Sequence, residues 1–171
     1  MVVKVSKPEV NIREKINELD YAHVPYEKMP AGSVIQTRAY KQNSGWISTT
    51  STSEVFTGVE FAIYPKRKNS LILVEFHFPM THTYSDTMIP TLRRQVDGET
   101  QINFNTTSYH NGYIQGATTS AYQSIMMTEH DYPDTTNRVN YEVYFSSAGG
   151  GQVHLAHNGS AYRLKLTEIA Q

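Results

Sequence analysis

The sequence of 171 residues contains no cysteine, which excludes disulfide bridges, thiolate-bound metals and a cysteine nucleophile. No apolar run reaches 18 residues, so no membrane insertion is expected, and the first residues lack the long apolar stretch of a signal peptide. Only 18% of the residues are charged and the formal net charge is −1. A nucleic-acid partner is therefore not expected, because binding nucleic acid needs a basic surface.

Recognisable catalytic motifs are also missing. The sequence has no serine nucleophile elbow, Gly-rich phosphate loop or zinc-protease pair, and its carboxylates are scattered. Asp131 and Asp134 flank Pro133, which we interpret as turn chemistry. His154 and His157 are three residues apart, which on a strand puts them on opposite faces, so they cannot share a metal unless a bulge intervenes. One histidine per chain could still meet its copies on a three-fold axis, but exposed or hydrogen-bonded histidine is commoner. We predict no catalytic residue, no metal and no cofactor.

Alternating apolar residues dominate from residue 34 onwards and predict an all-β chain. Ile72, Val74, Phe76 and Phe78 share one face of the strongest apolar run, which we expect to be central. Asp97-Gly98 is a signal for a two-residue hairpin. Nine or so short strands separated by turn residues predict an antiparallel, jelly-roll-like β-sandwich. The expected strands are Val34 to Tyr40, Val55 to Ile63, Leu71 to Phe78, Leu92 to Val96, Glu99 to Phe104, Ser124 to Glu129, Asn140 to Ser146, Gln152 to Ala156 and Tyr162 to Ile169.

One helix is predicted, over residues 10–21. Ile12, Ile16 and Leu19 are spaced four and then three, which is the rhythm of a coiled-coil seam, and isoleucine at such positions favours three or four helices. A helix of three turns is too short to be stable alone. It either forms a trimeric neck or lies on its own domain. Pro25 and Pro30 break the pattern, so residues 1–30 form a mounting segment and neck, and residues 31–171 form the head.

Two long loops could carry recognition, at residues 41–53 and 105–121. Flat aromatic rings on such loops can stack on the apolar faces of sugars or fill pockets on protein partners. The candidate ligand-binding residues are Trp46, Tyr109, Tyr113 and Tyr40, although for Tyr40 packing within the sandwich is the favoured alternative. Gly149-Gly150-Gly151 is interpreted as a flexible loop between two strands.

Several turns and core strands of residues 30–171 occur in a characteristic order. They are Pro30 to Gln36, Ser48 to Thr52 followed by Val55 to Pro65, the turn Ile63-Tyr64-Pro65-Lys66, Asn69 to Val74, Leu92-Arg93-Arg94 with Asp97-Gly98, Asp131 to Thr136 before Val139 to Phe145, and Leu164 to Gln171. In this order the segments resemble the C-terminal head domain of bacteriophage tail-fibre or virion-fibre proteins, the receptor-binding proteins common in marine phages. These segments are turns and core strands, so they bear on fold and assembly and not on a ligand.

The resemblance implies a homotrimeric virion protein with a β-sandwich head and a helical neck. It would be made in the host cytoplasm and mounted on other virion or tail proteins through residues 1–11. We expect it to act in host attachment by binding a cell-surface glycan or protein, with several linked weak sites raising the affinity. A purely structural virion component, such as a capsid decoration or a fibre adaptor, is the alternative. A glycan-degrading enzyme is disfavoured because no acid pair and no solenoid repeat is visible.

Overall fold

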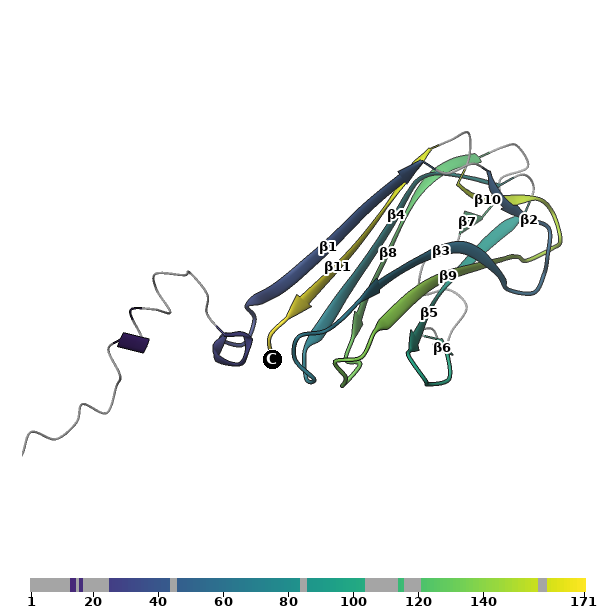
Figure 1. Ribbon diagram of the computed structural model, residues 1–171. Coiled ribbons are helices and arrows are strands. Elements are labelled where there is room, and N and C mark those ends of the chain that lie inside the picture. Colours follow the sequence, from purple (N-terminus) through teal and green to yellow (C-terminus); the bar gives the residue numbers. More distant parts are fainter. Residues whose placement is uncertain are drawn as a thin grey trace, which may run out of the picture.

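The computed structural model describes residues 13, 14, 16, 25–43, 46–83, 86–103, 114–115, 121–156 and 160–171 (Figure 1). Within this part the regular structure is β-strand, apart from one short 3-10 helix, η1 (Tyr26–Lys28), and the helical residues Arg13, Glu14 and Ile16. The strands are β1 (Val34–Asn43), β2 (Ile47–Thr49), β3 (Val55–Ile63), β4 (Leu71–Thr83), β5 (Thr87–Val96), β6 (Ile102–Asn103), β7 (Ile114–Gln115), β8 (Ala121–Asp131), β9 (Val139–Ser147), β10 (Val153–Ala156) and β11 (Ala161–Ile169).

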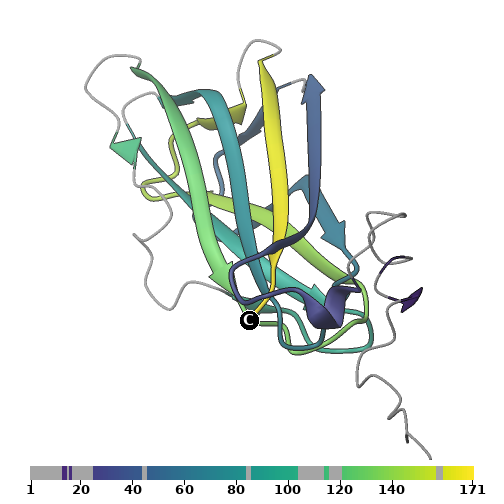
Figure 2. The same ribbon diagram turned by 90° about the vertical axis from the view of Figure 1, so that its left-hand side faces the viewer.

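Two antiparallel sheets pack face to face. Sheet A has the order β1-β11-β4-β10-β2, and β8 pairs with the other edge of β4 (Figure 2). Sheet B has the order β3-β9-β5-β6, with β7 also paired to β5. We call the end of sheet A where β1 begins and β11 finishes the base end, and the opposite end the distal end. The predicted all-β sandwich is confirmed.

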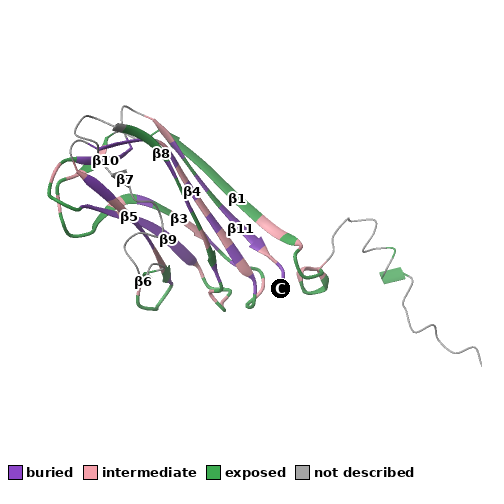
Figure 3. Cartoon of the chain, turned by 180° about the vertical axis from the view of Figure 1, so that it is seen from behind, coloured by how far each residue is buried: buried purple, intermediate pink, exposed green. Residues whose placement is uncertain are grey.

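The core lies between the inner faces of the two sheets (Figure 3). Ile72, Val74, Phe76 and Phe78 all have no exposed surface, which confirms the face predicted for the central strand. Burying each such side chain contributes about 1.5–3 kcal/mol relative to leaving it in water. β1 differs, because most of its residues are exposed and only one of its edges is paired.

Several strands begin or end elsewhere than predicted. β1 continues to Asn43, and β2 lies within the expected 41–53 loop. β5 starts at Thr87, five residues before the expected strand, and β7 and the start of β8 lie within the expected 105–121 loop. The hairpin at Asp97-Gly98 is present as a turn closed by the Glu99 N–H donating to Val96 O (2.9 Å), with Gly98 at φ 84°. Among the described residues, however, its strands pair only at Arg93 and Arg94.

The helical neck remains a prediction. Arg13, Glu14 and Ile16 have helical conformation and are exposed. Ile12 and Leu19 lie outside the described residues, as does most of residues 1–24. The expected linker contains η1, and the guanidinium of Arg67 lies at hydrogen-bond distance from the carbonyls of Tyr26 and Met29.

The base end is held by one fully buried carboxylate. Glu168 of β11 accepts hydrogen bonds from the N–H groups of Lys66 and Arg67 (2.8–3.0 Å), the Ser70 hydroxyl (2.7 Å) and the Gln36 amide (2.6 Å). It therefore fastens the turn between β3 and β4 to the last strand and to the first. Four of the segments that carry the family resemblance meet at this carboxylate, and they come from the beginning, the middle and the end of the head.

Asp131 corrects a sequence interpretation. It is not a turn residue but the buried last residue of β8, and it accepts hydrogen bonds from Arg94 Nη1 (2.7 Å) and the Tyr141 hydroxyl (2.8 Å). Burial raises the pKa of Asp131 more than these two partners lower it. Burial and the neighbouring Asp131 carboxylate also raise the pKa of Tyr141. Because a charge pair sits between the sheets, breaking it would leave an uncompensated buried group.

Candidate functional site

Four aromatic and imidazole rings form a row across the outer face of sheet A at the distal end. They come from β8 (Tyr122), β4 (His82), β10 (His154) and the segment before β2 (Trp46). Tyr122 is directly opposite His82, and His82 is directly opposite His154 in the strand register. Directly opposed residues on neighbouring strands share a face of the sheet. We call these four residues the aromatic row.

A β-bulge in β4 creates this row. Phe76 and Phe78 point into the core, and without an extra residue His82 would point the same way. Instead the pairing of β4 with β8 shifts register between Phe78 and Thr81. Thr81 and Thr83 are fully buried on the inner side, and His82 lies on the outer face.

The rings of the row are in contact. The centroids of Tyr122 and His82 are 4.6 Å apart with the rings stacked, those of His82 and His154 are 5.2 Å apart, and those of His154 and Trp46 are 5.1 Å apart in an edge-on arrangement. The two middle rings are buried (9% and 4% exposed), whereas Tyr122 (58%) and Trp46 (60%) at the two ends are exposed. The histidines thus support two solvent-facing flat rings.

Exposed rings held by packing in this way suit stacking against an apolar face of a ligand, because little conformational entropy remains to be lost on binding. Sugars offer such faces. No group of three or more His, Asp or Glu side chains within the described ranges could hold a metal, so the two histidines act here as ring partners.

Only part of this row could be anticipated from the sequence. Trp46 was predicted as a ligand-binding residue, and it is exposed at one end of the row. Tyr122, His82 and His154 were missed. His82 and His154 are 72 positions apart in the sequence, and no local pattern signals that their strands pair.

Tyr40 lies away from the row. Its partner in the register is the buried Leu164, so it points toward sheet B, where its ring stacks on Phe61 with centroids 5.9 Å apart. It remains 46% exposed at the rim between β1 and β3. Tyr40 thus packs on the sandwich, as its favoured alternative expects, and ligand binding by Tyr40 stays a prediction. Tyr109 and Tyr113 lie outside the described residues.

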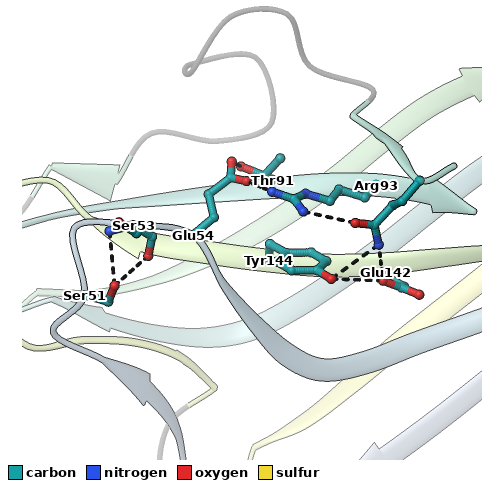
Figure 4. A network of polar contacts seen from close by, with 8 residues as sticks. Ser51, Ser53, Glu54, Thr91, Arg93, Glu142 and Tyr144 are labelled. Carbon is teal, nitrogen blue, oxygen red and sulfur yellow. Dashed lines mark hydrogen bonds and ion pairs between the residues drawn. The ribbon is translucent and has the colours of Figure 1, made fainter.

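A cluster of polar side chains, separate from the aromatic row, covers the outer face of sheet B (Figure 4). Arg93 lies over the ring of Tyr144 (4.0 Å to the centroid) and pairs with Glu54 and Gln101. All four oxygens of Glu54 and Glu142 accept hydrogen bonds, from Thr91 and Arg93 on Glu54 and from Asn140, Gln101 and Tyr144 on Glu142. A cluster whose carboxylates are satisfied internally stabilises the sheet without a ligand.

The GlyGlyGly segment 149–151 is anchored, contrary to the flexible loop expected. The Asp86 carboxylate accepts hydrogen bonds from the N–H groups of Gly149 (2.9 Å) and Gly151 and from the Ser147 hydroxyl. A Cβ on Gly151 would lie 2.9 Å from Asp86 Cβ, so the close approach of this carboxylate requires glycine there. Burial raises the pKa of Asp86, but the hydrogen bonds from Ser147, Thr87, Gly151 and Gly149 outweigh it and the net pKa is lowered.

The fold and the aromatic row together define an antiparallel β-sandwich that exposes two flat rings at its distal end. No family model and no curated protein sequence matches this chain. Among the helices of the described ranges, none is long and apolar enough to span a membrane.

Among the solved structures with partial similarity are two of infectious bursal disease virus. One is the crystal structure of the VP2 subviral particle of infectious bursal disease virus, with a TM-score of 0.47 and 15% identity over 81% of this chain and 34% of that chain. Another is the structure of infectious bursal disease virus, Gx strain, with a TM-score of 0.45 and 12% identity over 81% of this chain and 33% of that chain. This chain therefore spans about a third of the length of those proteins. At TM-scores below 0.5, the function of this chain has to be derived from its own residues.

Proposed function

We propose that this protein is a virion fibre-tip protein that attaches the particle to a host-surface glycan through the aromatic row. The observation that carries the proposal is the pair of exposed rings, Trp46 and Tyr122, held by buried histidines at the distal end of the sandwich. A trimer would present three copies of the row and so raise the affinity for a repetitive surface.

The placement of the row relative to the termini supports this proposal. β1 begins and β11 finishes at the base end, so the chain enters and leaves the head there (Figure 1). A head mounted on the virion through residues preceding β1 would point its distal end outward, where a receptor would be met. The ordered segments that resemble fibre heads supply the expectation of a virion protein, and they form the buried contacts of Glu168 and Asp131, far from the row.

The first experiment tests the row by removing its exposed rings. Trp46→Ala and Tyr122→Ala should each weaken binding of the purified protein to an immobilised panel of host-surface glycans by roughly tenfold, because stacking on an aromatic ring contributes about 1 kcal/mol beyond the area it buries. Tyr132→Ala is the matched control, since Tyr132 is 61% exposed but follows β8 at the base end. The control should bind as the unaltered protein does, and equal losses in all three variants would refute the assignment.

A structural virion component without a receptor remains the second candidate. Exposed apolar residues on or next to the edge strands β1 and β3, which we call the exposed rim, favour it. Val34 is 56% exposed, Phe56 42% and Tyr64 55%, and apolar surface of this kind often marks contacts between proteins. This candidate predicts that the protein binds virions and ignores every host glycan and whole host cells. Binding of the purified protein to host cells that is lost in Trp46→Ala would exclude it.

A further inference from the structure

Two cations face each other on the outer face of sheet A without an acidic partner. Lys41 of β1 and Arg163 of β11 are directly opposed in the register and are both exposed. Like charges directly opposed on antiparallel strands destabilise the pair. Neither side chain has an ion pair or a hydrogen bond to any described residue. Because this pairing of like charges disfavours folding, its presence needs an explanation other than stability.

The surroundings of Lys41 and Arg163 do not neutralise them. On β4 the residue opposite Arg163 is His77, whose Nε2 is 2.9 Å from Ser124 Oγ. On β11 the next outward residue is Lys165, and its ammonium is 2.6 Å from the Glu75 carboxylate, which is therefore engaged. The outward residues of β8 along this stretch are Ser124, Met126, Thr128 and His130. Besides the histidines, three cations thus face one acid over the described part of this face.

A shallow depression lies among these cations. It has a volume of about 330 Å³ and is lined by Ala39, Tyr40, Lys41, Arg163, Leu164 and Lys165. Ala39 is opposite Lys165 in the register, and its small side chain leaves the space between the long cationic ones. The side chains of Tyr40 and Leu164 point inward, so the apolar surface on this face consists of Ala39 and the aliphatic stems of the three cations. Such a surface suits a sugar ring that carries a negatively charged group, because the ring can pack on it while the anion meets the charges.

The depression and the aromatic row share one face of the molecule. His77, in the row of residues with Lys41 and Arg163, precedes His82 by five residues on β4, which corresponds to about 16 Å along a strand. In Figure 2 the four strands concerned, β8, β4, β11 and β1, lie side by side. An extended polysaccharide could therefore contact the exposed rings and the cations at once.

We propose that the Lys41–Arg163 pair binds the carboxylate or sulfate group of an acidic host polysaccharide. This inference rests on the proposed glycan-binding function and adds the class of glycan. Neutral polysaccharides would lack the contact that offsets the repulsion between the two cations. A neighbouring copy of this chain or a nucleic acid could also bring negative charge to this face, and the experiment below separates these occupants from an acidic glycan.

The experiment uses the full chain and three polysaccharides of matched length: alginate, which carries carboxylates, dextran sulfate, and neutral dextran. The unaltered protein should bind one or both of the acidic polymers, more weakly as salt rises, and bind dextran at least tenfold more weakly. Lys41→Ala combined with Arg163→Ala should reduce acidic-polymer binding at least tenfold. Its melting temperature should be equal to or above that of the unaltered protein, because the repulsion is relieved.

A matched control removes the same number of charges elsewhere. Lys66→Ala combined with Lys68→Ala lies in the turn at the base end, where both side chains are exposed, and it keeps the Lys66 N–H bond to Glu168. This control should bind the acidic polymers within twofold of the unaltered protein. An equal loss in both double variants would overturn the proposal, and so would equal binding of duplex DNA with the same dependence on Lys41 and Arg163.

Two further outcomes separate this inference from the function on which it rests. If Trp46→Ala loses glycan binding and the Lys41/Arg163 double variant does not, the acidic-group proposal is wrong and the attachment function stands. If the double variant changes the oligomeric mass in solution, the face binds another copy and the proposal is overturned. Absence of binding to every polymer and every panel glycan would refute both.

Discussion

At the scale of single residues, buried and half-buried carboxylates order loops of this protein whose local sequence does not predict an ordered conformation. Asp86 holds the Gly149–Gly151 segment against the start of β5, and it receives hydrogen bonds from four residues. Hydrogen bonds to a charged acceptor are stronger than neutral ones, at about 1.5–3 kcal/mol each, and are not additive. The glycines look like a flexible loop in the sequence because the carboxylate that orders them lies some 60 positions earlier.

Asp86→Asn should destabilise the protein by about 1–3 kcal/mol at pH 7, because the amide replaces a charged acceptor with a group that also donates. The sign of the pH dependence follows from the lowered pKa of Asp86. Its contribution is present above the ordinary value of 3.8 and is lost as the pH falls through the lower folded value. Urea midpoints at pH 7 and pH 3 should therefore differ less in the variant than in the unaltered protein.

The control for this measurement is Asp134→Asn. Asp134 is 73% exposed in its side chain and pairs only loosely with Lys68, at 3.6 Å. Exposed pairs of this kind contribute about 0–1 kcal/mol, so the control should unfold at nearly the same urea concentration as the unaltered protein. An Asp86→Asn variant as stable as the control at both pH values would show that the anchor contributes nothing.

At the scale of strands, the alternation of apolar residues predicted most of the architecture because it is a local property of the sequence. The inward face of β4 over Ile72, Val74, Phe76 and Phe78 follows directly from a period of two. The same reasoning fails past Phe78, where the bulge reverses the faces and brings His82 outward. Trp46 could be named as a candidate because it is the only tryptophan and lies among polar residues. Its partners could not be named, since they come from strands whose pairing is a long-range property.

Contacts between elements explain why certain segments occur together. The Ile63-Tyr64-Pro65-Lys66 turn and the last strand meet at Glu168, and Leu92-Arg93-Arg94 meets Asp131 through Arg94. The sequence shows these segments as separate turns and strands. Only the pairing of β11 with β4 and of β5 with β9 makes each set one structural unit. Each of these two buried polar contacts thus joins segments that are distant in the sequence.

Glu168→Gln should destabilise the protein by about 2–4 kcal/mol. Its carboxylate is fully buried and accepts from four donors, and an amide nitrogen in place of one oxygen would face N–H groups without accepting from them. Chemical denaturation monitored by the fluorescence of Trp46 and by circular dichroism measures the loss. Glu75→Gln makes the same chemical change at a partly exposed ion pair with Lys165 and should alter stability by less than about 1 kcal/mol.

At the scale of the whole molecule, the number of chains in the assembly sets how many weak binding sites act together in attachment. Ile16 is 49% exposed in the single chain, an unusual exposure for isoleucine in a helical conformation. The spacing of Ile12, Ile16 and Leu19 offers a seam on which copies could pack. The exposed rim of β1 and β3 offers a second surface, within the head. The two surfaces make different predictions about what holds a trimer together.

We expect the full chain to have a mass in solution of about 58 kDa, three times the 19.4 kDa of one chain, by light scattering. Ile12→Asp combined with Ile16→Asp should reduce this to a single chain, because two charges per chain would have to be buried in the seam. The head should stay folded, with an unchanged circular dichroism spectrum. Binding to a densely coated glycan surface should fall by about a hundredfold, while affinity for a short soluble oligosaccharide stays the same, since only the linkage between sites is lost.

A single chain in the unaltered protein would contradict the trimer. A trimer that persists in the double variant would place the contact on the head, and Phe56→Lys at the exposed rim should then dissociate it.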